Sequence, residues 1–192
     1  MRRWRRWIAI LVILLLAAAI ACWISFEYLP KRRAMNERTA ATMIKILSLA
    51  EVDFRDHDRD GNRVKDFWTG DVSGLFRAGL IERDLAEADA SPITPLCAKP
   101  VPYEGYYFVA LQGDASVAPP ESYRRDTDKK SGDVHHPEKY GFLAYPANPG
   151  RSGKYYYMIN ERNCVWRAPL EAPLPTHWPP DAELKMWWSQ PE

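Results

Sequence analysis

The sequence predicts an α+β fold in which an N-terminal transmembrane helix leads into an amphipathic helix packed on a small antiparallel sheet of about four strands. Three observations predict it: an uncharged run of membrane-spanning length, a following segment with a helical apolar period, and aromatic runs confined to the second half. We expect three segments: a short tail with the membrane helix (1–29), an α+β domain (30–168) and a tail rich in proline and tryptophan (169–192).

The membrane helix is predicted from residues 7–26, which contain no charged side chain. A helix of this length is about 30 Å long, which matches the hydrocarbon thickness of a bilayer. Arginines stand immediately before it, at Arg2, Arg3, Arg5 and Arg6. We therefore expect a single-pass anchor whose first partner is the lipid bilayer.

Two other fates of this segment stay open. The small residues 17–21 suit a signal-peptidase site, although the apolar run continues beyond them to Phe26. The sequence Ala19-Ile20-Ala21-Cys22 places a cysteine after small residues, as a bacterial lipobox does, so Cys22 is a candidate for lipidation. The length of the apolar run favours the uncleaved anchor.

The orientation follows from the cost of moving charge across a bilayer. Basic residues on the far side of the span, Lys31, Arg32, Arg33 and Arg38, match the number in front of it, so the charge count is a tie. Moving four guanidiniums and the amino terminus through hydrocarbon is costly. We therefore expect a location in the cytoplasmic (inner) membrane, with the N-terminus inside and the C-terminal domain extracytoplasmic.

Composition and cysteine usage describe the part beyond the membrane. Its size suits one domain, and the near balance of 26 basic and 25 acidic residues provides no field that would attract nucleic acid, so that partner is not expected. Two cysteines, Cys97 and Cys164, lie in a compartment that we expect to be oxidising. They predict a disulfide.

The elements of the domain are predicted from period and turn chemistry. Pro30 is expected to end or kink the first helix, and Asn36 to cap a second. The second helix has apolar residues at helical spacing (Met43, Ile44, Leu47, Ala50, Phe54). Aromatic runs at 105–112, 140–146, 154–160 and 164–167 predict an antiparallel meander. Residues 119–137 predict a long exposed loop that carries His135 and His136.

This order of parts resembles that of type IV pilins and type II secretion pseudopilins. The stretch 36–76 (NERTAATMIKILSLAEVDFRDHDRDGNRVKDFWTGDVSGLF) and the strand GYYFVAL at 105–111 are similar to uncharacterised bacterial pseudopilin-like proteins. The resemblance covers residues 36–166, but the chain lacks the prepilin cleavage motif, a glycine before the apolar run with a glutamate five residues into it. It implies a pilin-like architecture and a structural or interaction role among envelope or secretion-system proteins.

A cation site is predicted at Asp58, Asp60, Asn62 and Asp66, where oxygen-bearing side chains alternate along a loop. Calcium takes six to eight oxygen ligands, and such spacing supplies them. Against this, Arg63 occupies the place where calcium loops favour glycine, and aspartates of a solvated loop also cap backbone N–H groups. The alternative function is therefore an anchored calcium-dependent binding module. No nucleophile, phosphate-loop or dinucleotide motif is present, so we do not expect an enzyme.

Overall fold

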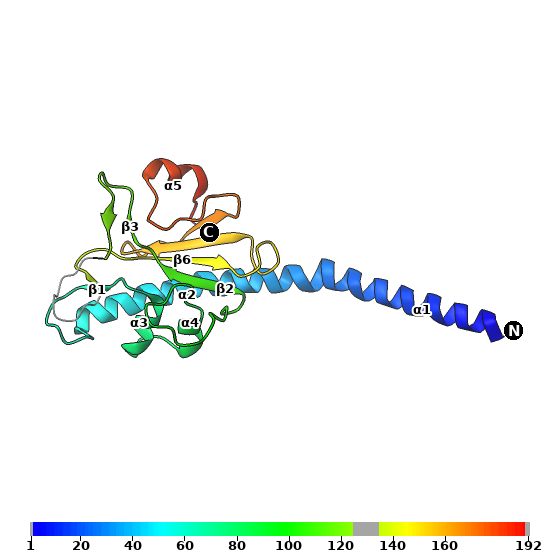
Figure 1. Cartoon of the computed structure of the whole chain (residues 1–192). Helices are drawn as coiled ribbons and strands as arrows, with labels where there is room; N and C mark the ends of the chain where they lie inside the picture. Colours follow the sequence, from blue (N-terminus) through cyan, green and yellow to red (C-terminus); the bar gives the residue numbers. More distant parts are fainter. Residues whose placement is uncertain (1, 125–134, 191–192) are drawn as a thin grey trace.

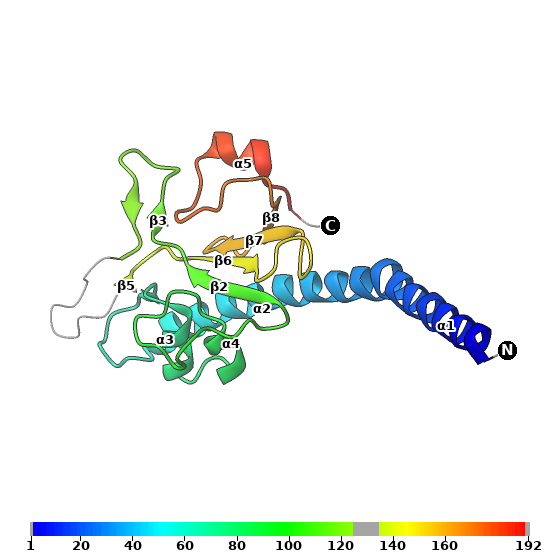
Figure 2. The same cartoon turned by 45° about the vertical axis from the view of Figure 1, so that its right-hand side comes forward.

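A computed structural model of the chain describes residues 2–124 and 135–190. One helical rod begins the molecule, and an α+β domain surrounds its C-terminal half (Figure 1). The rod consists of α1 (Arg2–Trp23), the π-helical turn η1 (Ile24–Tyr28) and α2 (Leu29–His57). The first half of the rod projects away from the domain in both views (Figures 1 and 2).

The projecting half of the rod is long and apolar enough to cross a membrane, and the rest of the described chain buries none of its apolar window. The large apolar side chains from Ile10 to Ile24 are exposed. Water is a poor environment for a continuous apolar surface of this size. These properties suit a membrane anchor or a signal sequence.

Of the two outcomes that the sequence predicts at Pro30, an end or a kink, the helix does not end there, and the rod bends between α1 and α2 (Figure 2). The turn just before it widens to π-helical geometry, and the N–H of Leu29 donates to the carbonyl of Ile24, five residues back. Pro30 then falls in the first turn of α2, where a missing N–H is tolerated. Asn36 is also not a cap: it is buried inside α2, and its amide donates to the Ser152 carbonyl at 3.0 Å.

The main sheet has four antiparallel strands, as the aromatic runs predict. They are β2 (Tyr106–Ala110), β6 (Gly141–Pro146), β7 (Tyr155–Asn160) and β8 (Trp166–Pro169), in the order β2-β6-β7-β8. Phe108 lies opposite Ala144, and Leu143 opposite Met158. Because side chains alternate along a strand, the sheet presents one apolar set to each face.

Each face of the sheet has its own core. On one face, α2 buries Ile44, Leu47 and Phe54 against Phe108 and other strand residues. This side also carries two short helices, α3 (Val72–Arg77) and α4 (Arg83–Glu87). On the other face, the C-terminal segment and its helix α5 (Asp181–Trp187) cover the sheet (Figure 2). The tail that the sequence separates at residue 169 is thus packed as part of the domain.

Within the described residues, four two-residue strands complete the fold, and none of them was predicted. β1 (Phe67–Trp68) pairs with β5 (His135–His136), and β3 (Gly113–Asp114) pairs with β4 (Glu121–Ser122). Of the predicted exposed loop at 119–137, residues 125–134 lie outside the described part. The prediction is wrong for its end, since both histidines of β5 are buried.

The predicted disulfide between Cys97 and Cys164 is not formed, and both cysteines are free. Cys97 donates to the carbonyl of Glu87, next to the segment that pairs with the outer edge of β2 through Asp89 and Phe108. Cys164 lies between β7 and β8. At least two strand spacings, about 10 Å, separate these places, which exceeds the reach of a disulfide.

Candidate metal centre

The predicted cation loop begins where α2 ends. Asp58 adopts a left-handed conformation (φ 48°), and its N–H donates to the carbonyl of Phe54, which closes the helix. Residues 58–66 then lead into β1. Since β1 pairs with β5, the loop comes to lie beside His135, whose ring contacts those of Phe54 and Trp68 at centroid distances of 5.9 and 5.5 Å.

The loop holds its shape through hydrogen bonds from its own backbone. Both carboxylate oxygens of Asp58 accept from the Arg63 N–H at 3.1 Å, and Asn62 accepts from Val64 at 2.6 Å. Arg63 has a φ of 66°, in the left-handed region that favours glycine. The tight turn, for which calcium loops favour glycine, is therefore made by an arginine. Asp58 and Asn62 use side-chain oxygens to stabilise it.

The predicted ligands do not all converge, and a histidine joins two of them. One ligand atom each from Asp60, Asp66 and His135 lies within 4.8 Å of the other two. The Nδ1 of His135 is 3.1 Å from an oxygen of Asp66. Its Nε2 is 3.6 Å from an oxygen of Asp60 and has no hydrogen bond. The cluster thus differs from the predicted set by gaining an imidazole nitrogen.

Burial differs among the members of the cluster. His135 and Asp66 have fully buried side chains, whereas the side chain of Asp60 is 16% exposed. The site is therefore closed on the side of the core, and Asp60 connects it to solvent.

Several carboxyl groups gather around the cluster. Glu51 of α2 is fully buried, and this burial raises its pKa well above the usual value. The Trp68 N–H lowers the pKa in part, and the nearby Asp66 carboxylate raises it further. Neither carboxylate oxygen of Glu51 has a hydrogen bond of good geometry. Burial likewise raises the pKa of Asp60; the Asn62 N–H and His135 oppose the increase, and neighbouring carboxylates add to it. A cation placed among these groups would favour their ionised forms.

No local sequence signal predicts the position of His135. It is 69 residues from Asp66 in the chain, and β5 is too short to show an alternating pattern. The pairing of β1 with β5 is a tertiary contact that brings the two together. A histidine in a polar segment is ordinarily exposed, so the residue type also predicted an exposed side chain where the structure has a buried one.

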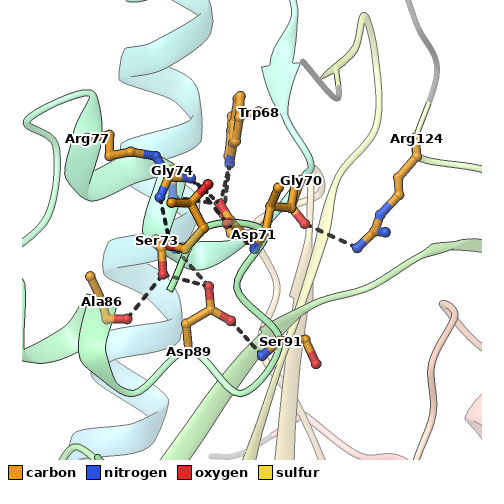
Figure 3. Close-up of polar contacts among 12 residues, drawn as sticks. Trp68, Gly70, Asp71, Ser73, Gly74, Arg77, Ala86, Asp89, Ser91 and Arg124 are labelled. Carbon is orange, nitrogen blue, oxygen red and sulfur yellow. Dashed lines mark hydrogen bonds and ion pairs between the residues drawn. The ribbon is translucent and has the colours of Figure 1, made fainter. Parts of the chain in front are cut away.

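A second polar cluster lies at the start of α3, around two buried aspartates (Figure 3). The Asp71 carboxylate accepts from the backbone N–H of Gly74 at 2.6 Å and of Ile93 at 2.7 Å, and it pairs with Arg77. The Asp89 carboxylate accepts from the N–H and hydroxyl of Ser73. Because these oxygens are occupied by groups of the chain, the cluster positions α3 against α4 and the segment that follows.

Comparison with known proteins yields one family. The model of the family described as a protein of unknown function (DUF2950) matches residues 25–172. The match begins at the end of the apolar helix and includes α2, the cation loop and the four main strands. No curated protein and no solved structure matches the chain.

Proposed function

The chain belongs to the DUF2950 family of unknown function, and from this premise we propose that it is a membrane-anchored, pilin- or pseudopilin-like protein of the bacterial cell envelope. Its role is structural or in interaction with other envelope or secretion-system proteins. It is a non-enzymatic protein whose anchor holds the α+β domain at the membrane surface.

The observation that carries this proposal is the difference in surroundings between the two halves of the helical rod. The first half exposes its apolar side chains, while the second half buries a stripe against the four-stranded sheet. A helix shared in this way between an apolar environment and a domain matches the pilin-like order of parts. The exposed half requires lipid, or helices of neighbouring molecules, to cover it.

Aromatic and charged residues support placement across the inner membrane. Trp7 and Tyr28 are exposed, and about 32 Å of helix separates them, close to the hydrocarbon thickness of a bilayer. Such residues favour the two membrane interfaces. Beyond Tyr28, the exposed Lys31 and Arg32 lie at headgroup depth. The N-terminal arginines then remain in the cytoplasm, and the domain lies outside.

Membrane fractionation of cells that produce the full-length protein tests the anchor and its orientation. The protein should resist extraction with alkaline carbonate, and external protease should digest the domain in spheroplasts but not in intact cells. Intact-mass analysis of the purified protein separates an unmodified chain from one that is cleaved or lipidated at Cys22. A carbonate-soluble cytosolic protein with an intact N-terminus contradicts the proposal.

Photo-crosslinking tests the interaction role. A photoreactive amino acid at Met35, 60% exposed on α2 near the membrane, should capture a second copy or another envelope protein. The same amino acid at Met186, 73% exposed on α5, is the matched control. Equal absence of adducts at both positions contradicts an interface along the helix.

The alternative, an anchored calcium-dependent binding module, is favoured by the conformation of the loop. Arg63 makes the left-handed turn that such loops require, with its N–H donated to Asp58. A Ca²⁺ titration of the full-length protein in detergent tests it. A resolved affinity that is lost in both Asp58→Asn and Asp60→Asn supports the alternative, and no heat in the unsubstituted protein contradicts it.

A further inference from the structure

We propose that Asp60 and Nε2 of His135 bind a divalent transition-metal ion of the Zn²⁺ class, and that Asp66 orients the imidazole through Nδ1. The ion joins the loop after α2 to the β1–β5 ribbon. This inference goes beyond the proposed envelope role and does not depend on it.

The first argument is convergence from separate parts of the chain. Asp60 lies in the loop, Asp66 immediately precedes β1, and His135 begins β5. Their ligand atoms nevertheless lie within 4.8 Å of one another. Pairing of β1 with β5 places the histidine there, so the arrangement is built by the fold rather than by proximity in sequence.

The second argument is the state of the imidazole. His135 is fully buried, yet its Nε2 has no hydrogen bond. A buried polar atom without a partner is costly, and a metal ion would satisfy it. Asp66 next to Nδ1 favours the tautomer with the proton on Nδ1 and the lone pair on Nε2. A carboxylate that orients a histidine in this way is typical of metal sites.

The third argument is the spacing of the ligand atoms. Nε2 of His135 and the nearer oxygen of Asp60 are 3.6 Å apart, too far for a good hydrogen bond. Two ligands bound to one tetrahedral zinc ion are about 3.4 Å apart, given bonds of about 2.0–2.1 Å. The pair can therefore accommodate an ion with a small adjustment of the exposed loop.

Charge and ligand type indicate the class of ion. The carboxylates of Asp60 and Asp66 offset the charge of a divalent ion beside the imidazole. Zinc and related ions accept mixed nitrogen and oxygen ligands, whereas calcium takes oxygens. The side-chain oxygens of Asp58 and Asn62 accept hydrogen bonds from the backbone N–H groups of Arg63 and Val64.

Calorimetric titration with ZnCl₂ tests the site, with full-length untagged protein in detergent after chelator treatment. We expect one ion per chain. Asp60→Asn should weaken binding at least about tenfold, as loss of a ligand or of its support does at other metal sites. Asp56→Asn is the matched control, because it removes the same charge from an exposed position of α2 and should leave the affinity unchanged.

A spectroscopic titration with Co²⁺ tests the nitrogen ligand. The visible absorption of bound Co²⁺ should be present in the unsubstituted protein and lost in His135→Gln. If circular dichroism shows that this variant is unfolded, Asp60→Asn is used in the same Co²⁺ titration. Asp60 is exposed, so this substitution should leave the domain folded.

Three results overturn the proposal. The first is the absence of Zn²⁺ binding, and the second is an equal affinity in Asp60→Asn and Asp56→Asn. The third is tighter binding of Ca²⁺ than of Zn²⁺ that is lost in Asp58→Asn but retained in His135→Gln. That last result would instead support the calcium alternative.

Discussion

At the residue scale, Gly74 shows how closely α3 approaches β1. A Cβ at this position would overlap the Nε1 and Cε2 atoms of the Trp68 indole. The indole cannot simply move away, because its Nε1 donates to the Asp71 carbonyl at 2.8 Å. We expect Gly74→Ala to lower the free energy of unfolding by about 1–3 kcal/mol, measured by urea denaturation of the full-length protein in detergent.

A double-mutant cycle with Trp68→Phe is the control for this prediction. Phenylalanine is smaller than tryptophan and lacks the Nε1 and Cζ2 atoms that the new methyl group would overlap. The double variant should therefore lose less stability than the sum of the two single variants. Additive losses would show that the contact between Gly74 and Trp68 is not the cause.

Asp114 provides a prediction about pH. Burial alone would raise its pKa, but hydrogen bonds from Ser116 and Lys139 outweigh this, and the pKa lies below the usual value. A carboxyl group whose pKa is lowered by folding stabilises the protein above its unfolded pKa of about 3.9 and loses this contribution as the pH falls through the folded pKa. The stability difference between the unsubstituted protein and Asp114→Asn should therefore shrink from about pH 6 to about pH 3.

Urea unfolding at several pH values measures this difference. Asp56→Asn is the comparison, since it removes an exposed carboxylate from α2. A difference for Asp114→Asn that stays constant with pH would contradict the role of Lys139, whose amine lies 3.0 Å from the carboxylate.

Among single residues, contacts between chain neighbours could be predicted from the sequence, and contacts between distant residues could not. The oxygen-bearing pattern at Asp58, Asp60, Asn62 and Asp66 correctly predicted a tight polar loop, because the turn is formed by neighbours in the chain. His135 was missed because its environment depends on a contact 69 residues away. Asn36 was misinterpreted for the same reason, since its partner is the distant carbonyl of Ser152.

At the element scale, α2 has one buried face and one exposed face. Leu47 is fully buried, whereas Leu49, two residues on, is 60% exposed. Leu47→Ala should destabilise the domain by about 2–5 kcal/mol, because it removes buried methyl groups and leaves a cavity. Leu49→Ala, with the same chemistry, should change stability by less than about 0.5 kcal/mol. Equal effects in thermal unfolding would contradict the packing of α2 on the sheet.

Elements long enough to show a repeating apolar pattern could be predicted, and elements of two residues could not. The strand β2 alternates buried and half-buried residues over five positions, enough to identify a strand packed on one face. The strands β1 and β5 have two residues each and follow from tertiary pairing. Pro30 left both an end and a kink of the helix open, because nothing in the local pattern reveals the π-helical turn η1 that accommodates it.

At the scale of the whole molecule, the C-terminal segment completes a second core. Trp178 and Trp188 are 4% and 5% exposed and pack against the face of the sheet opposite α2. Trp178→Ala should therefore cost about 3–5 kcal/mol of unfolding free energy. Met186→Ala is the control, since that side chain is 73% exposed. If both variants denature at the same urea concentration, the segment does not stabilise the domain.

The exposed half of the rod raises the question of what covers it. If lipid covers it, charge at the middle of the span must be strongly disfavoured. Leu15 and Leu16 lie at that point and are 62% and 59% exposed. Each arginine at a helix centre costs about 2.5–3.5 kcal/mol of insertion free energy. We therefore expect Leu15→Arg/Leu16→Arg to move the protein out of the carbonate-resistant membrane fraction.

The matched control is Leu15→Ile/Leu16→Ile, which keeps the span apolar and should leave the protein in the membrane. The domain provides an internal check, since these side chains do not belong to either of its cores. Its unfolding transition should therefore be unchanged in both variants. If the arginine variant stays in the membrane fraction with the same yield, hydrocarbon does not surround this part of the helix, and the surface must instead be covered by protein.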